Sequence, residues 1–130
     1  MPNVCFFSFT EADREVVLTI KGRAVNPDYQ NLNFRVKDLL KRWNTDNVAV
    51  IRQAISKAMS GTSRTIVFVG EKTYQSRWVR EEVRMTLDNM KPVYAIRLKD
   101  TNGTKPKVLE DNNIHLYNWS EERLQYLATQ

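Results

Sequence analysis

The sequence contains one cysteine, Cys5, and one histidine, His115, among its 130 residues. A single cysteine excludes an internal disulfide and suits a reducing compartment, so we expect a cytoplasmic protein. Together, one cysteine and one histidine exclude the usual zinc clusters and any histidine-rich metal site. We therefore expect no metal among the functional groups.

Long apolar runs and runs of like charge are also missing. The first nine residues, MPNVCFFSF, have neither a basic start nor a long apolar stretch, which predicts no signal peptide and no membrane-spanning helix. The net charge is +5, but lysine and arginine alternate with acids, as in residues 77–84. Such mixing is typical of a solvated surface and makes nucleic acid a less favoured partner.

Several catalytic motifs are absent. No GxxxxGK[ST] occurs and no GxGxxG follows the first predicted strand, which argues against a P-loop NTPase and against glycine-rich dinucleotide binding. A Ser–His–Asp triad would require His115, which lies in a short predicted edge strand where a structural or exposed histidine is favoured. Cys5 lies inside the first predicted strand, where a small buried hydrophobe is favoured over a nucleophile.

Apolar runs mark the strands of the predicted sheet. Residues 4–9 (VCFFSF), 65–69 (TIVFV) and 92–98 (PVYAIRL) are short, almost continuous apolar runs, as in strands covered on both faces. Residues 34–40 fit both strand and helix spacing, and we expect a short strand or edge segment that runs into a turn of helix. A last short strand is predicted at residues 114–117. The polar stretches 23–33 and 100–113 are predicted to be loops.

Helices are predicted between these strands from their caps and apolar stripes. The first is expected to begin at Thr10, with Asp13 completing a capping box, and to end at Gly22. The other three are expected to begin at Thr45 or Asp46, at Ser76 and at Ser120.

This alternation of strands and helices predicts an α/β fold in one domain spanning residues 1–130. We expect a three-layer sandwich, with a central, mostly parallel sheet of about five strands and helices on both faces. Ligands of such sheets bind beyond the carboxyl ends of the strands. The rule selects residues 8–10, 70–76 and 99–101 before any motif is considered.

A tryptophan and a glutamate lie one turn apart on the third predicted helix. Trp78 and Glu82 share a helix face at the predicted border between core and solvent, whereas Glu81 is expected to point about 100° away, toward water. A carboxylate beside an indole can hold a ribose diol and stabilise positive charge at an anomeric carbon. In the alternative interpretation, which spacing alone favours, Trp78 packs the helix on the sheet and Glu82 is a surface acid paired with Arg77 or Lys72.

Three segments give the chain a resemblance to a known family. They are the opening VCFFSF of residues 4–9, the strand TIVFVG of residues 65–70, and the more specific TYQSRWVREE of residues 73–82. The chain resembles the TIR-like family, especially the stand-alone TIR-like proteins of bacterial Thoeris antiphage systems. The resemblance implies a flavodoxin-like, TIR-type fold, and it is weak between residues 23 and 43, where the family's variable loop falls.

The resemblance also implies roles for individual residues. Glu82 matches the glutamate that supports cleavage of the nicotinamide–ribose bond of NAD in active members. The implied substrate-binding residues are Ser8, Phe9, Thr10, Tyr74 and Trp78. Thr10 departs from the arginine or histidine often found there, and Arg14, Lys72 and Arg77 are alternative sources of positive charge. NAD is implied as the substrate, with no tightly bound cofactor.

The function implied by the resemblance is consumption of NAD, giving ADP-ribose or a cyclic ADP-ribose-type signal in antiphage defence. A separate effector protein would sense the product, and the enzyme would form homo-oligomers on activation. A second hypothesis is a non-catalytic TIR-like module that acts by self-association. A third is nucleic-acid binding through the basic surface, which predicts affinity that falls steeply with salt.

Overall fold

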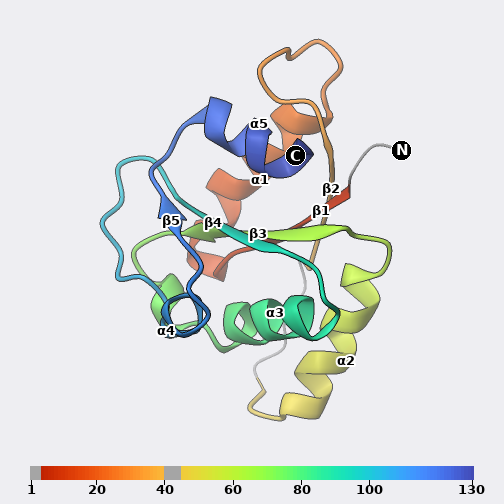
Figure 1. Ribbon diagram of the computed structural model, residues 1–130, viewed down its shortest axis with the longest axis vertical. Coiled ribbons are helices and arrows are strands. Elements are labelled where there is room, and N and C mark those ends of the chain that lie inside the picture. The colour runs from red at the N-terminus through yellow and green to blue at the C-terminus, as the bar shows by residue number, and fades with distance from the viewer. Residues whose placement is uncertain (1–3, 40–44) are drawn as a thin grey trace.

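A parallel sheet forms the central layer of the protein, with helices on both of its faces (Figure 1). The computed structural model describes residues 4–39 and 45–130. Its strands are β1 (Val4–Ser8), β2 (Arg35–Asp38), β3 (Arg64–Val69), β4 (Val93–Arg97) and β5 (Leu116–Tyr117). Its helices are α1 (Arg14–Val25), α2 (Val48–Met59), α3 (Arg77–Asp88), α4 (Lys107–Asp111) and α5 (Glu121–Thr129), with 3-10 turns η1 (Glu11–Asp13) and η2 (Thr73–Gln75).

The strand order is β2-β1-β3-β4-β5, and every neighbouring pair is parallel. This is the doubly wound order in which the chain reverses direction across the sheet next to β1. Helices α1 and α5 cover one face, and α2, α3 and α4 cover the other (Figure 1). The predicted three-layer α/β fold with a parallel five-stranded sheet is therefore confirmed for the described residues.

Strand β1 supplies side chains to both faces of the sheet because successive residues of a strand point in opposite directions. Cys5 and Phe7 lie in the core under α1 and α5, whereas Phe6 packs with Ile51 and Ile55 of α2. Every residue of β3 is buried, which explains why its sequence is a continuous apolar run.

Polar caps begin three of the helices. Ser76 and Ser120 accept hydrogen bonds from the backbone N–H groups of Val79 and Arg123, as predicted. The cap predicted at Thr45 or Asp46 is wrong. Asn47 caps α2 instead, because its side-chain oxygen accepts bonds from the N–H groups of the second and third helical residues, at 3.0 and 3.4 Å.

The start and end of α1 also differ from the prediction. Thr10 makes no side-chain cap bond and precedes the 3-10 turn η1, so the predicted capping box does not form. Asp13 stands at the N-cap of α1 without capping it. The helix runs past Gly22 to Val25, because its buried stripe continues to Ala24.

The predicted loop at residues 100–113 contains helix α4. Val108 and Leu109 are buried there against Val69 and Val83, which gives this short segment enough apolar contact to fold as a helix. A pattern of two apolar residues among polar neighbours was too short to predict a helix. Helix α4 lies beside α3 on the same face of the sheet (Figure 1).

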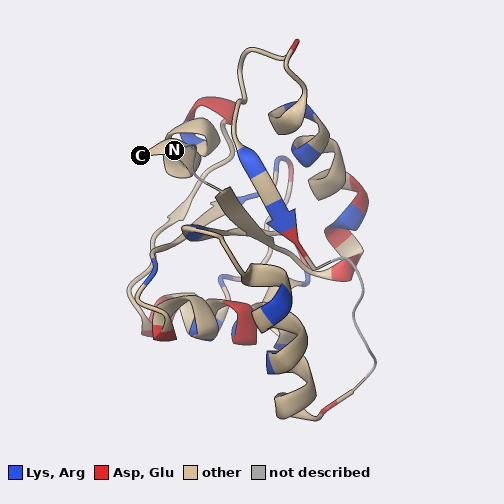
Figure 2. Ribbon diagram, turned by 90° about the vertical axis from the view of Figure 1, so that its right-hand side faces the viewer, with Lys and Arg blue, Asp and Glu red and all other residues tan. Residues whose placement is uncertain are grey.

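The sheet edges carry charge or are short. On β2, exposed Arg35 and Lys37 precede the acidic Asp38, seen as blue bands ending in red in Figure 2. Strand β5 has only two residues. Charged or very short edges hinder pairing with another sheet. Within the described ranges, no helix combines the length and apolarity needed to cross a membrane.

Candidate functional site

A buried hydrogen bond joins the carboxyl end of β1 to helix α3. The Ser8 hydroxyl donates to the Glu82 carboxylate at 2.7 Å, and both residues have no exposed surface. Ser8 is the last residue of β1 and faces α3 because Phe7 before it points to the opposite face. The parallel sheet thus brings together two predicted site residues that are 74 positions apart.

Helix α3 is held in the rotation that directs Glu82 toward the sheet. Val79, Glu82, Val83 and Thr86 share its buried side, at the three- and four-residue spacing of one helix face. The hydroxyl of Thr86 lies 2.6 Å from that of Thr65 on β3 and donates to the Glu82 carbonyl oxygen at 2.8 Å. These contacts fix the height and rotation at which the carboxylate meets Ser8.

The expected position of Glu82 at the border between core and solvent is wrong. Its exposed fraction is 0%, because α3 packs with this side flat against β1 and β3. The alternative, in which Glu82 is a surface acid, is also wrong because the residue is fully buried. Arg77, one of its two suggested partners, forms an ion pair with Asp46. Burying a carboxylate without partners costs several kcal/mol, so its bond to Ser8 is a substantial part of what permits this position.

Glu81 is also buried, contrary to the prediction that it points to water. Its exposed fraction is 2%, and Arg52 of α2 donates to it at 2.9 Å. Arg80 and Arg84 approach its other oxygen at 3.7 and 3.2 Å. The predicted angle between Glu81 and Glu82 follows from helix geometry, but the arginines cover what would have been a solvent-facing acid.

The other predicted site residues lie in three regions. Phe9 follows Ser8 and is 1% exposed in the core under α1 and α5, and Thr10 comes next at the start of η1. Trp78 is partly buried one turn before Glu82, packed with Phe6 and the α2 side chains. Tyr74 lies elsewhere: it is 47% exposed and lines a hollow between α3 and α4. The substrate-binding roles of all four stay predictions.

Two further acids at the carboxyl edge were missed by sequence reasoning. Asp38 ends β2 with a side chain 3% exposed and accepts a hydrogen bond from Lys21 at 2.8 Å. Asp13 has a buried oxygen, Oδ2, without a hydrogen-bond partner, and a side chain added at Gly70 would collide with this carboxyl group. Both acids follow predicted strand or helix boundaries, a signal too general to single them out.

Burial raises the pKa of Asp13 above its ordinary value. A side-chain hydrogen bond with Thr73 opposes this shift in the pKa, and the negative charge of Glu71 adds to it. In the described part of the chain, no group of three or more His, Cys, Asp or Glu side chains is placed to hold a metal ion.

Comparison with known proteins identifies the family. The sequence model of the family described as "Thoeris protein ThsB, TIR-like domain" matches residues 6–103. The structure is similar to the TIR domain of the Toll-related receptor TRR-2 from Hydra magnipapillata, with a TM-score of 0.59 at 15% identity, covering 98% of this chain and 91% of that one. No curated protein matches the sequence significantly.

The structural likeness agrees with the fold, and the family match includes β1, β3, α3 and β4, which together carry Ser8 and Glu82. Because the match spans most of the chain, the protein belongs to the family of Thoeris ThsB TIR-like domains.

Proposed function

We propose that the protein is an NAD-consuming enzyme that cleaves the nicotinamide–ribose bond, with Glu82 as its catalytic residue. The observation that carries the proposal is the bond between Ser8 and Glu82 at the carboxyl end of β1. Ligands of doubly wound sheets bind at this edge, next to the point where the strand order reverses. Membership of the ThsB TIR-like family supports the same assignment.

Glu82 acts on the ribose next to nicotinamide. When the C1′–N bond breaks, nicotinamide leaves with the bonding electrons and positive charge develops at C1′ and the ring oxygen. A carboxylate near this centre stabilises that charge, as carboxylates do in glycoside hydrolysis. Ser8 orients the carboxylate through its hydrogen bond, and NAD is a substrate that needs no resident cofactor.

The nucleophile decides the product. Attack by water gives ADP-ribose, nicotinamide and a proton. If water is excluded, a nitrogen of the adenine ring attacks C1′ and gives a cyclic ADP-ribose isomer, again with release of nicotinamide and a proton. We favour the cyclic product as a signal that a separate effector protein detects during antiphage defence.

The burial of Glu82 sets a condition on activity. A carboxylate that is 0% exposed meets a ribose only after the side chains above it move aside. Such a rearrangement fits an enzyme that stays inactive until infection and then assembles into homo-oligomers. Turnover by the pure protein is accordingly expected to be low without the trigger.

The test is product analysis of NAD incubated with purified protein, with and without extract of infected cells. The Glu82→Gln variant keeps the shape of the side chain and an oxygen that can accept from Ser8, so the fold should persist. We expect its NAD turnover to fall by about 100-fold or more, the scale of losing charge stabilisation in a transition state.

The neighbouring Glu81→Gln variant is the matched control. It makes the same change in a carboxylate that is equally buried but faces the arginines of α2 and α3. We expect its turnover to stay within a few-fold of the wild type. Full activity in the Glu82→Gln variant would falsify the assignment.

A second candidate is a non-catalytic module that acts by self-association. The observation in its favour is the burial of Glu82 with a satisfied hydrogen bond, which is also how a purely structural acid is held. In that case the wild type forms no product even with infected-cell extract, while Glu82→Gln still lowers the free energy of unfolding by about 1–3 kcal/mol.

A further inference from the structure

A hollow in the surface lies on the side of α3 that faces away from Glu82. A hollow of about 460 Å³ separates the first half of α3 from α4. This volume is within the range of small-molecule sites, about 300–1,000 Å³. Its side chains include the cations Arg80, Arg84 and Lys107, and the acid Asp111.

The two arginines are held in place by a buried acid. Arg84 donates to the Oε2 atom of Glu81 at 3.2 Å, and Nε of Arg80 lies 3.7 Å from the same oxygen. Arg52 occupies the other oxygen of Glu81 from the α2 side. One buried carboxylate therefore contacts three guanidinium groups. Arg52 also pairs with Asp88 at 3.5 Å, whereas Arg80 and Arg84 share the single charge of Glu81.

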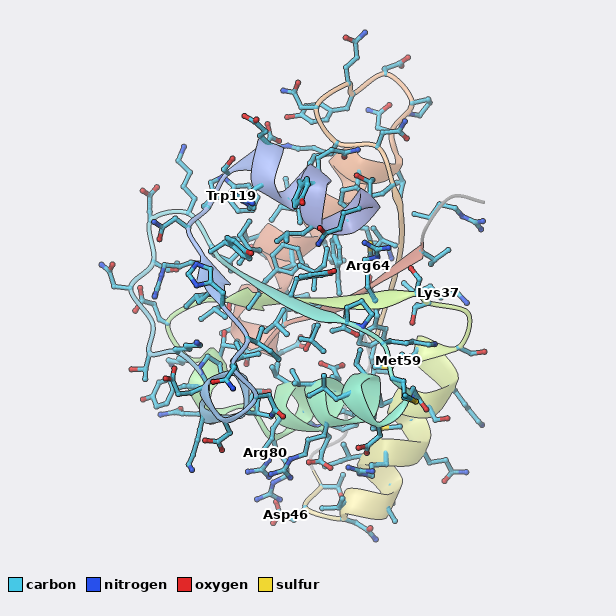
Figure 3. The ribbon with its side chains drawn as sticks, viewed as in Figure 1. Lys37, Asp46, Met59, Arg64, Arg80 and Trp119 are labelled. Carbon is cyan, nitrogen blue, oxygen red and sulfur yellow. The ribbon has the colours of Figure 1, made fainter. Side chains whose placement is uncertain are left out.

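The guanidinium groups remain accessible. The side chains of Arg80 and Arg84 are 44% and 52% exposed, and Figure 3 shows Arg80 beyond α3, on the side away from the sheet. A guanidinium has five N–H donors in a planar fork that matches phosphate oxygens. With Lys107, the side chains that line the hollow carry three positive charges and one negative charge, from Asp111, which lies 3.4 Å from Lys107. Glu81, behind the two arginines, adds a second negative charge, so a net positive charge remains.

An aromatic ring and apolar side chains complete the lining. Tyr74 is 47% exposed, and its hydroxyl accepts from the Gln75 amide at 2.8 Å, which ties down the polar end of the ring. Val79 and Val108 are buried and contribute apolar wall. An exposed aromatic ring offers a stacking surface to a nucleobase, worth about 1–3 kcal/mol per base.

We propose that the hollow between α3 and α4 binds a nucleoside phosphate, with the phosphates on Arg80, Arg84 and Lys107 and the base on Tyr74. The combination of clustered cations with a free aromatic face and an apolar wall favours this ligand over a bare anion. The site is independent of the proposed NAD chemistry, because Glu82 lies on the opposite, sheet-facing side of α3.

The test is a titration of the whole protein with ADP, followed by NMR of the arginine Nε–Hε groups and by calorimetry. We expect ADP to shift the Nε–Hε signals of Arg80 and Arg84. Because Lys107 is exposed and has no contact with Glu81 to lose, Lys107→Glu should preserve the fold. We expect it to weaken ADP binding about tenfold, as for the loss of one charge-assisted contact.

Matched variants separate the two parts of the ligand. Tyr74→Ala should weaken ADP binding about tenfold, for loss of stacking, and leave pyrophosphate binding unchanged. Lys57→Glu makes the same charge change as Lys107→Glu at an exposed position of α2 outside the hollow, and should leave ADP affinity within twofold.

Three results would overturn the proposal. The first is a titration in which ADP shifts only signals near Ser8 and Glu82, or none. The second is equal weakening by Lys57→Glu and Lys107→Glu, which would indicate attraction to overall charge. The third is single-stranded RNA binding far more tightly than ADP with a steep salt dependence, which would assign the arginines to a nucleic-acid surface.

Discussion

At the scale of single residues, Asp13 is the clearest case of a polar group whose burial lowers the stability of the fold. Its Oδ2 atom is buried without a hydrogen-bond partner, close to Gly70 at the end of β3. Burial and the charge of Glu71 both raise its pKa, and the bond with Thr73 offsets only part of this effect. The ionised side chain therefore opposes folding at neutral pH.

The pH dependence follows from the direction of this shift. The folded-state pKa of Asp13 lies above the ordinary value of 3.8, so the folded protein binds this proton more tightly than the unfolded chain. The resulting stability is fully present below pH 3.8 and is lost as the pH rises through the folded-state pKa. The contribution of Asp13 to stability is therefore smaller at pH 7 than at pH 3.

Replacing Asp13 with Asn should therefore stabilise the protein at pH 7 and have little effect at pH 3. We expect the free energy of unfolding to rise by about 1 kcal/mol at pH 7, the low end for a partly solvated group. Urea denaturation at both pH values measures the change. The control Asp28→Asn, at an exposed loop position, should be neutral at both, and an equal gain at pH 3 and pH 7 would contradict a charge effect.

At the scale of secondary-structure elements, two glycines with different surroundings should respond in opposite ways to replacement by alanine. Gly22 lies in α1 with nothing within 4 Å of an added Cβ. Gly103 lies in the segment after β4, where an added Cβ would overlap the backbone carbonyl oxygen of Gly70. The second contact brings the β4–α4 segment directly onto the end of β3.

Gly22→Ala should raise the free energy of unfolding by about 0.5–1 kcal/mol, because alanine loses less backbone entropy in a helix. Gly103→Ala should lower it by about 1–3 kcal/mol or more, because backbone atoms must shift to make room. Thermal denaturation of the two variants beside the wild type measures both. A neutral Gly103→Ala would show that the β4–α4 segment adjusts freely.

At the scale of the whole molecule, Cys5 reports on the stability of all three layers. It lies in β1, between β2 and β3 in the sheet, and is 0% exposed. Its Sγ atom lies 3.5 Å from the Ala128 carbonyl oxygen of α5. Burial raises the pKa of its thiol to about 12, partly opposed by the positive charge of Arg64. Both access and ionisation are therefore suppressed in the folded protein.

We expect the native protein to react with a thiol reagent at pH 8 at least about a thousandfold more slowly than the unfolded chain, as for exposure through global unfolding. Reaction in guanidinium should give one thiol per chain. The native rate should rise with denaturant in parallel with unfolding. A rate insensitive to denaturant would mean instead that α5 opens alone.

The sheet could be predicted from sequence because its strands differ so clearly from what surrounds them. The run TIVFV fixes β3 as a central strand, and alternation with helices then leaves few topologies. Ser76 and Ser120 could be predicted as N-caps because capping depends on the local sequence, here a hydroxyl residue just before an apolar helical stripe. The N-cap of α2 could not be predicted in the same way, because Thr45, Asp46 and Asn47 are all good capping residues and the local sequence does not rank them.

The candidate site was only partly predictable. The strand-end rule selected Ser8 and the helix spacing singled out Glu82, whereas their roles came from the resemblance. Their hydrogen bond agrees with strand ends that meet at one edge. Their complete burial was not predictable, since it depends on how flat α3 lies on β1 and β3. The burial of Glu81 depends on Arg52 from another helix, a tertiary contact absent from the α3 sequence.

Two consecutive carboxylates hold α3 from opposite sides, Glu82 through Ser8 and Glu81 through Arg52. A rotation of the helix about its own axis would break both bonds together and leave Glu82 buried without Ser8, at a cost of several kcal/mol. Glu81 would lose Arg52 but keep Arg84, which turns with it on α3. Rotation of α3 about its axis is therefore an unfavourable way to open Ser8 to a ligand. We expect a ligand to reach Ser8 instead when α3 moves away from the sheet as a rigid body or when the chain beside it is displaced.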